Sequence, residues 1–346
     1  MFCANVCANM CANVCTGGWM ISIAVLGTGG TIASRRDSAG WLTVSSGIDA
    51  LLQDVVIPDG AKVDAEDVMS RPSFAISSTD LVSVAQAVRD RLQGSYDAVV
   101  VAHGTDTLEE TAFLLAQVLP RDARVVLTGA QRGQDEPDWD GLRNLRDALA
   151  VAACAVPLGP AVVMGGVVTA AVEARKVHTS AVEAFSGGAA GAIALVDDGI
   201  VYPLGQSLRG AKYAGRALPV ELPRVDLVKL VVGVDGVHVR ASIEAGARGI
   251  VLEAFGSGNV TADMLAAIHE AIAQGVVVTV CSRTGGGHVR AIYGEGGGAE
   301  VAQAGAVFAG DLTGPRARIA LALALAFDGE QDAVTAVRDM VRSGSW

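Results

Sequence analysis

From Ile21 onward, the chain alternates short apolar runs rich in Val and Ile with longer segments of helical periodicity. Apolar runs of this length are typical of strands buried on both faces, and their alternation with helices favours an α/β fold with a mainly parallel sheet. The clearest predicted strands cover residues 21–26, 98–102, 125–128, 161–164, 192–196, 227–232, 249–254 and 276–281.

Helical periodicity is clearest in two segments. Residues 79–93 place their apolar side chains on one face. In residues 261–274, Thr261 is positioned to cap the start of the helix and Gly275 to end it. The apolar face of the first predicted helix holds Leu81, Val84, Ala85, Val88 and Leu92.

The 346 residues are enough for two domains. Residues 203–224 contain several Pro and Gly with little periodicity, which indicates a linker. We therefore expect a larger N-terminal domain over residues 20–202 and a smaller C-terminal domain over residues 225–346.

The opening sequence MFCANVCANMCANVC repeats every four residues and holds four of the six cysteines. On a helix this repeat forms a stripe of thiols, and thiolates bind soft metals. However, the repeat has low complexity and lacks CxxC spacing. We interpret residues 1–19 as a disordered extension or the product of a misplaced start codon, with Met20 as the natural beginning.

The charge balance excludes some partners. There are 37 acidic and 26 basic residues, for a net charge of −11, which argues against a broad nucleic-acid surface. Residues 1–34 carry no charged side chain, but they lack a basic start, and the apolar run 20–26 is too short to cross a bilayer. We expect a soluble, cytoplasmic protein without membrane partners.

A glycine-rich turn follows the first predicted strand. If Gly27 and Gly29 begin a dinucleotide fingerprint, the third glycine belongs at position 32, which is Ile. The Gly-Lys-Ser/Thr ending of a phosphate loop is also missing. What remains are the hydroxyls of Thr28 and Thr31 beside free backbone amides, which acyl transfer requires. An ordinary tight turn is the alternative.

A second polar segment, HGTDTLEET, begins at His103 after the predicted strand 98–102. Thr107 and Glu110 have capping-box spacing, so Thr105 and Asp106 are expected in the turn before a helix, at the carboxyl edge of the sheet. The alternatives are that Thr107 and Glu110 only cap the helix, and that Asp106 is a turn residue whose side chain accepts hydrogen bonds from its own backbone. We predict that His103 is a packed residue.

A third segment, ARKVHTS, follows a long apolar stretch. A lysine in such surroundings tends to have a lowered pKa, and its neutral amine can take a proton from a threonine hydroxyl. The alternative is a solvated pair of Arg175 and Lys176 on a loop.

Taken in order, the motifs TGGTIA, HGTDTLEETA, GAQR followed by DGLRN, and RKVHTSAVEAF resemble the bacterial-type L-asparaginases, a family that includes glutaminase-asparaginases. The likeness runs from about Met20 to the C-terminus and includes GSGN at 256–259 and GDLTGPRAR at 310–318. It implies a larger N-terminal α/β domain, a smaller flavodoxin-like C-terminal domain, and a homotetramer or homodimer. It also implies hydrolysis of an amide through a threonine acyl-enzyme, with no cofactor or metal.

The resemblance also assigns residues. By position in their motifs, Thr31 resembles the nucleophile and Thr105 the second active-site threonine. Asp106 resembles the carboxylate that holds the substrate α-amino group, and Lys176 the active-site lysine.

Further positions correspond to the family's substrate-binding residues. Ser73 resembles the serine that holds the substrate α-carboxylate, and Gly30 and Gly104 belong to the same substrate-binding set. Ser257 stands where many members place an Asn that reaches the neighbouring subunit's site.

One position departs from the family pattern. Where the family has a tyrosine on the loop after the nucleophile, this chain has Trp41, followed by Leu42. An indole N–H cannot accept a proton. Three explanations remain open: Lys176 and Thr105 activate Thr31 more directly, another loop supplies the group, or activity is reduced.

The sequence therefore predicts an L-asparaginase acting on L-asparagine. The alternatives are a glutaminase-asparaginase, which also takes L-glutamine, and a non-catalytic amino-acid-binding protein on the same scaffold. The five His are scattered, and neither HExxH nor paired CxxC occurs, so no metal site is predicted.

Overall fold

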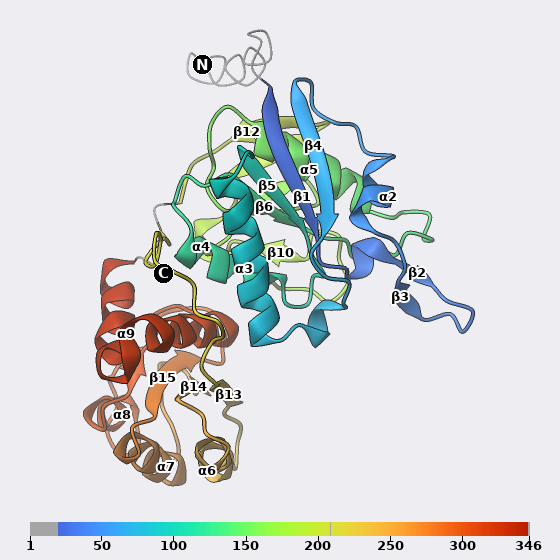
Figure 1. The fold of residues 1–346 in the computed structure, drawn as a ribbon. Helices are drawn as coiled ribbons and strands as arrows, with labels where there is room; N and C mark the ends of the chain where they lie inside the picture. Colours follow the sequence, from blue (N-terminus) through green and yellow to red (C-terminus); the bar gives the residue numbers. More distant parts are fainter. Residues whose placement is uncertain (1–19, 208, 345–346) are drawn as a thin grey trace, which may run out of the picture. The chain divides into compact units, whose positions relative to one another are not determined.

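The computed structural model describes residues 20–207 and 209–344. They form two compact units, the first ending at Leu218 and the second beginning at Pro219, within the predicted linker segment. Figure 1 shows the elements of both units. The predicted extension, residues 1–19, lies outside the described residues. The domain limits expected from the sequence stay a prediction.

An eight-stranded sheet forms the centre of the first unit, in the order β12-β11-β8-β7-β6-β5-β1-β4. The pairs β7–β6, β6–β5, β5–β1 and β1–β4 are parallel. The pairs β12–β11, β11–β8 and β8–β7 are antiparallel. The strands are β1 (Ile21–Gly27), β4 (Ala61–Asp67), β5 (Ala98–Ala102), β6 (Val125–Thr128), β7 (Ala161–Met164), β8 (Val167–Ala170), β11 (Ala194–Asp197) and β12 (Ile200–Pro203).

The predicted α/β class is confirmed, but the sheet is mixed because two tight turns reverse the chain. Gly165 and Gly166 join β7 to β8 with φ of 60° and 80°. Asp198 and Gly199 join β11 to β12 with φ of 47° and 77°. Consecutive positive φ values are typical of hairpin turns that match the twist of antiparallel strands.

The helices of the first unit follow the apolar pattern of the sequence. They are α2 (Ile48–Leu52), α3 (Ser78–Gln93), α4 (Leu108–Val118) and α5 (Gly141–Ala153). The predicted face of α3 is confirmed, since Leu81, Val84, Ala85 and Val88 are buried. Ser77 and Asp80 form a reciprocal capping box at its start.

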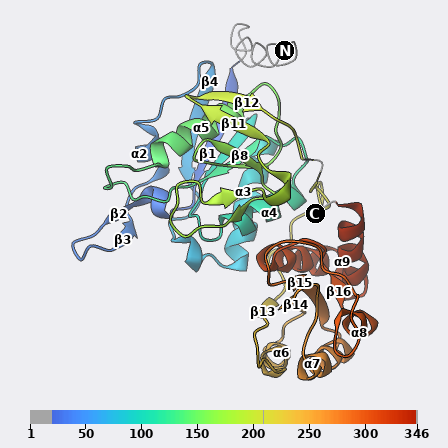
Figure 2. The same cartoon turned by 180° about the vertical axis from the view of Figure 1, so that it is seen from behind.

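Short elements carry the connections of the first unit. A hairpin of β2 (Ser34–Arg36) and β3 (Leu42–Val44) projects from this unit in Figures 1 and 2. The others are η2 (Thr31–Ala33), η3 (Ser73–Ala75), β9 (Arg175–Lys176), β10 (Phe185–Ser186) and η4 (Gly188–Ala190).

The second unit is a parallel four-stranded sheet in the order β13-β14-β15-β16. The predicted cap of its second helix is confirmed, because the Thr261 hydroxyl accepts from the backbone N–H of Met264 at 3.2 Å. The elements are β13 (Val225–Lys229), α6 (Val237–Glu244), β14 (Gly249–Ala254), α7 (Ala262–Ala273), β15 (Val277–Ser282), α8 (Gly298–Gln303), β16 (Val307–Phe308) and α9 (Gly314–Ser343).

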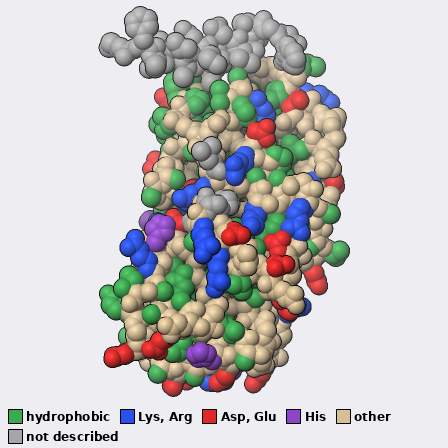
Figure 3. All heavy atoms as spheres, turned by 90° about the vertical axis from the view of Figure 1, so that its left-hand side faces the viewer, with side chains coloured by type: hydrophobic (Ala, Val, Ile, Leu, Met, Phe, Trp, Pro, Cys, Tyr) green, Lys and Arg blue, Asp and Glu red, His purple; other side chains and the backbone are tan. Residues whose placement is uncertain are grey.

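Two features of the described residues bear on partners. Over residues 20–207 and 209–344, every helix is too short or too polar to cross a membrane. On the face drawn in Figure 3, Asp and Glu side chains interrupt the Lys and Arg side chains.

Candidate active site

The glycine-rich turn after β1 separates its two threonines into different roles. Thr28 is fully buried, and both its backbone N–H and its hydroxyl donate to the carbonyl of Ala102, at 3.0 and 3.1 Å. These bonds join the ends of β1 and β5. Thr31 begins η2 and is partly exposed. The hydroxyl available for chemistry on this turn is therefore that of Thr31.

Two glycines let this turn contact the turn after β5. Gly30 has φ of 83°, and a Cβ on it would lie 2.3 Å from the Cα of Gly104. A Cβ on Gly104 would lie 2.6 Å from Ser73 Oγ. Only glycine permits backbones to approach this closely. Three segments far apart in the sequence thus meet at one point beside Thr31.

A lysine from β9 contacts the turn after β5. Lys176, in β9, donates from Nζ to Thr105 Oγ1 at 2.9 Å and forms an ion pair with Asp106 Oδ1 at 2.7 Å. Thr105 is 5% exposed, the Lys176 side chain 16%, and the Asp106 side chain 56%. The alternative of a solvated lysine is therefore wrong. The arrangement places an amine on a buried hydroxyl, with one carboxylate facing solvent.

The backbone of Lys176 is also held in place. Its N–H donates to the Glu109 carboxylate at 2.7 Å. Glu109 lies in the first turn of α4, so α4 anchors the strand that carries the lysine. Sequence reasoning did not single out Glu109, because nothing local in HGTDTLEET connects it with a strand about 70 residues later.

The predicted capping box of Thr107 and Glu110 is wrong. Thr107 is the N-cap of α4, but its side chain makes no cap hydrogen bond. Its hydroxyl instead donates to the Ser73 carbonyl at 2.9 Å, and the Asp106 N–H donates to Ser73 Oγ at 3.2 Å. A tertiary partner has replaced the local one, which fixes Ser73 against the start of α4.

His103 is buried, as predicted, between the strand and the helix. Its Nδ1 lies 2.7 Å from the Gly104 carbonyl and its Nε2 lies 2.9 Å from Thr111 Oγ1. Burial lowers the pKa of His103 to about 4. A neutral ring satisfies both contacts if Nδ1–H donates to the carbonyl and Nε2 accepts from the hydroxyl. His103 therefore braces the backbone immediately before Thr105.

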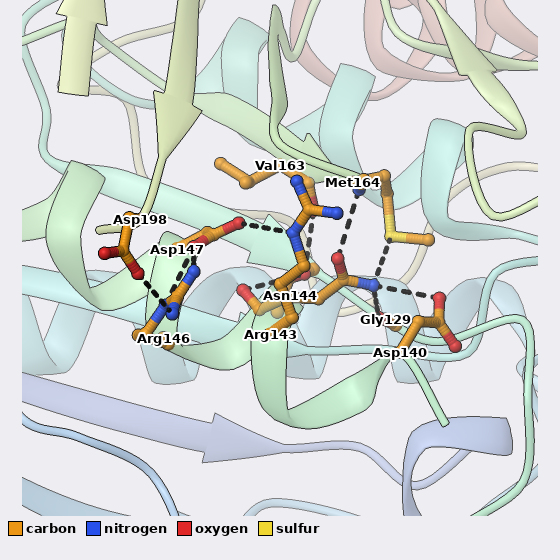
Figure 4. Close-up of polar contacts among 11 residues, drawn as sticks. Gly129, Asp140, Arg143, Asn144, Arg146, Asp147, Val163, Met164 and Asp198 are labelled. Atoms are coloured by element: carbon orange, nitrogen blue, oxygen red, sulfur yellow. Dashed lines mark hydrogen bonds and ion pairs between the residues drawn. The ribbon is translucent and has the colours of Figure 1, made fainter. Parts of the chain in front are cut away.

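A polar network around Asn144 of α5 links the ends of β6 and β7 (Figure 4). The fully buried Asn144 donates from Nδ2 to the Gly129 carbonyl at 2.9 Å and to Asp140 at 3.0 Å, and its Oδ1 accepts from the Gly165 N–H at 3.1 Å. A Cβ on Gly129 would lie 3.0 Å from the Thr105 methyl group. The GAQR and DGLRN motifs thus hold the ends of β6 and β7 against the site.

Residues 22–207 match the family described as "Asparaginase, N-terminal", and residues 224–337 match the "Glutaminase/Asparaginase C-terminal domain". The chain belongs to the asparaginase family. The resemblance inferred from the motifs is thereby confirmed, together with the two-domain asparaginase fold.

Individual relatives of this asparaginase-family chain agree over nearly its whole length. An L-asparaginase from Bacillus licheniformis is 33% identical over 310 residues, 88% of this chain and 95% of the relative. A "Probable L-asparaginase" from Deinococcus radiodurans is 37% identical over 309 residues, 88% and 92%. The solved structure of the "Probable Cytoplasmic L-asparaginase from Campylobacter jejuni" has a TM-score of 0.82 at 29% identity, covering 92% of this chain and 99% of that one.

Two further predicted positions belong to other elements of the chain. Ser257 belongs to the second unit, in the turn after β14, where its carbonyl accepts from the Arg290 N–H at 2.7 Å. Trp41 lies in the turn of the β2–β3 hairpin, 72% exposed, and its backbone N–H donates to Asp37 Oδ1 at 3.0 Å. The role of Ser257 stays a prediction.

The residues that the structure describes contain no group of three or more His, Cys, Asp or Glu side chains placed to hold a metal ion. The site described above consists of hydroxyls, one lysine, one exposed carboxylate and backbone amides. This is a set suited to nucleophilic acyl transfer.

Proposed function

We propose that this asparaginase-family protein is an L-asparaginase that hydrolyses L-asparagine to L-aspartate and ammonia through a threonine acyl-enzyme. The observation that carries the proposal is the Lys176–Thr105 contact at 2.9 Å, on the turn that Gly30 brings next to Thr31. The names of the relatives from Bacillus licheniformis and Deinococcus radiodurans support asparagine as the substrate.

In the proposed reaction, Thr31 Oγ attacks the side-chain carboxamide carbon and forms a C–O bond. Backbone amides of the glycine turn stabilise the oxyanion of the tetrahedral intermediate. The C–N bond breaks as the nitrogen takes a proton and leaves as ammonia, and water then hydrolyses the ester on Thr31. Thr105 and Lys176, in contact with each other, take the proton of the Thr31 hydroxyl as the C–O bond forms and return it to the nitrogen as the C–N bond breaks.

The proposed binding mode uses the charges at the rim. Asp106 uses Oδ1 for Lys176, and its side chain is 56% exposed, so the carboxylate also faces an incoming substrate ammonium. The hydroxyl of Ser73, held beside Gly104, is assigned to the substrate α-carboxylate. Two contacts of opposite polarity fix one orientation and turn attack into a positioned, intramolecular step.

The exposed Trp41 bears on how the nucleophile is activated. Its indole cannot accept a proton, and Leu42 beside it is apolar. Of the three explanations open from the sequence, we favour activation of Thr31 by the Lys176–Thr105 pair. This pair is already assembled at hydrogen-bonding distance.

The test is ammonia release by the purified protein supplied separately with L-asparagine and L-glutamine, with Thr31→Ala as the blank. Release from asparagine alone supports the proposal. Comparable release from both makes the protein a glutaminase-asparaginase, and release from neither favours an amino-acid-binding role.

The glutaminase-asparaginase alternative has one supporting observation. A relative from Pseudomonas fluorescens biotype A, 29% identical over 280 residues, is named "Glutaminase-asparaginase". One methylene separates the two substrates and is worth about 1–3 kcal/mol of discrimination. Direct comparison of kcat/KM therefore decides between them.

The oligomer and the location belong to the same proposal. We propose a homotetramer or homodimer in the cytoplasm, the location in the name of the relative from Campylobacter jejuni. Light scattering on the purified protein and fractionation of producing cells test these two points.

A further inference from the structure

The loop between β6 and α5 contacts the segment that carries the nucleophile through one side chain, Gln134. Its Nε2 donates to the Ile32 carbonyl at 3.2 Å, and its Oε1 accepts from Arg35 Nε at 2.9 Å and from the Ser46 hydroxyl at 3.1 Å. Its backbone N–H donates to the Ser34 carbonyl at 3.0 Å. One residue therefore reaches η2, β2 and the exit of β3.

The chemistry of these partners requires an amide. A guanidinium N–H can only donate and a carbonyl oxygen can only accept, so the side chain needs an acceptor and a donor at its end. Glutamine provides both, whereas glutamate would place a carboxylate against the carbonyl of Ile32. The partners thus fix both the residue type and the orientation of its amide.

Other contacts along this loop are weaker or less directional. A Cβ on Gly133 would lie 2.7 Å from Leu42 Cδ2, so the loop packs against β3. Arg36 approaches Asp135 at 3.9 Å and Glu136 at 3.8 Å, but its side chain is 50% exposed. Exposed ion pairs contribute little to stability, so the amide of Gln134 is the main directional tie.

The turn that Gln134 holds is the one containing Thr31. On its other side, the Gly30 carbonyl accepts from Ser34 Oγ at 2.8 Å and from the Ala33 N–H at 3.0 Å. With the Ile32 carbonyl tied to Gln134, the residues on both sides of Thr31 have carbonyl groups with fixed partners. A misplacement of about 1 Å at a reacting group costs about 100-fold in rate.

We propose that Gln134 is a positioning residue for the amide hydrolysis. Its carboxamide ties the Thr31–Ile32 turn and the β2–β3 hairpin to the 131–136 loop, so that nucleophile and hairpin are held as one unit. The catalytic part of this inference rests on the proposed function, because it takes Thr31 as the nucleophile.

The experiment compares Gln134→Glu, Gln134→Met and a matched control, Gln86→Glu. Gln86 is an exposed residue of α3 whose Nε2 donates to Asp90 Oδ1 at 2.7 Å. Three quantities are measured on the full chain: kcat and KM for L-asparagine, amide hydrogen exchange of residues 31–46, and the melting temperature.

We expect Gln134→Glu, which keeps acceptors for Arg35 and Ser46, to lower kcat about tenfold or more with KM within about threefold. Gln134→Met, which loses all three side-chain bonds, should also raise KM and speed exchange over residues 31–46. Gln86→Glu should keep kcat, KM and exchange at wild-type values.

The inference is overturned by kcat within about twofold of wild type in both Gln134 variants, or by unchanged exchange over residues 31–46 in Gln134→Met. A fall in melting temperature with kcat per folded molecule unchanged also overturns it, since that marks a purely structural residue. If the wild-type protein releases no ammonia, the proposed function fails by itself, and the exchange measurement still decides whether Gln134 ties the turn to the hairpin.

Discussion

Glycine turns lie at the carboxyl ends of parallel strands in both units, but different groups pack against them. In both units a glycine turn follows a buried strand. In the first, a Cβ on Gly30 would meet the backbone of Gly104 at 2.3 Å. In the second, a Cβ on Gly258 would meet the ring of Phe308 at 2.6 Å. One turn is closed by a second polar turn and the other by an apolar side chain.

The two units also hold comparable lysine–carboxylate pairs. Lys176 and Asp106 are 2.7 Å apart with the lysine side chain 16% exposed, whereas Lys229 and Glu253 are 3.1 Å apart with the lysine 61% exposed. The first lysine also contacts a buried hydroxyl, Thr105 Oγ1. Burial and a third partner, more than the presence of an ion pair, therefore distinguish a candidate catalytic lysine from a surface one.

The largest expected effect comes from removing the proposed nucleophile. Thr31→Ala should lower kcat by about 10³-fold or more, since no other hydroxyl replaces the one that forms the ester. Folding should be unaffected because Thr31 is only partly buried. The measurement is ammonia release at saturating L-asparagine, with circular dichroism as the check on folding. Activity equal to wild type in this variant would remove Thr31 from the mechanism.

The next effect tests the two lysines against each other. Lys176→Met should lower kcat about 10²- to 10⁴-fold, because it removes the proton-transfer group at Thr105. Lys229→Met, the matched control in the second unit, should leave kcat within about twofold, since Lys229 is 61% exposed and has no part in the proposed proton transfer. Equal losses of kcat in both variants, measured on folded protein, would show that Lys176 has no special role in the reaction.

The buried titratable groups differ between the units as well. Burial lowers the pKa of His103 to about 4 in the first unit, and burial raises the pKa of Cys281 to about 12 in the second. Between pH 6.5 and about 4, the unfolded state binds a proton at position 103 that the folded state does not. The free energy of unfolding should therefore fall by about 3 kcal/mol as the pH falls through this window. Above pH 6.5 the contribution of His103 to this free energy is complete.

Denaturant unfolding of the wild-type protein and of His103→Gln at several pH values tests this. The variant should be less stable at pH 7, because the hydrogen bonds to Gly104 and Thr111 are altered, but it should lose the contribution of position 103 to the pH slope. If the variant keeps the full wild-type slope, His103 is not its source.

The smallest expected effect comes from Ser257, a residue of the second unit with a proposed role in substrate binding. Ser257→Ala should raise KM for L-asparagine about fivefold with kcat nearly unchanged, the loss of about one hydrogen bond to substrate. Steady-state kinetics at several substrate concentrations separates the two constants. An unaltered KM would remove Ser257 from the binding site.

Local patterns in the sequence were sufficient for much of the fold. Residues 98–102, 125–128, 161–164 and 249–254 are strands with the predicted bounds, and Thr261 caps its helix. These features depend on side-chain periodicity or on partners within three residues, so a short window contains the information. The hairpin strands β8 and β12 were missed because their antiparallel arrangement depends on tight turns, although Asp198-Gly199 is a recognisable signal.

The site divides in the same way. From its own residues, the sequence determined which hydroxyls and carboxylate follow strands, and its motifs identified the family. Only the tertiary structure decided that Thr28 serves the sheet, that Thr107 bonds to Ser73 instead of capping its helix, and that Lys176 rests on Thr105. Each of these choices depends on a partner between about 30 and 75 residues away, where the close packing of glycine turns, and no local preference, selects the hydrogen bond.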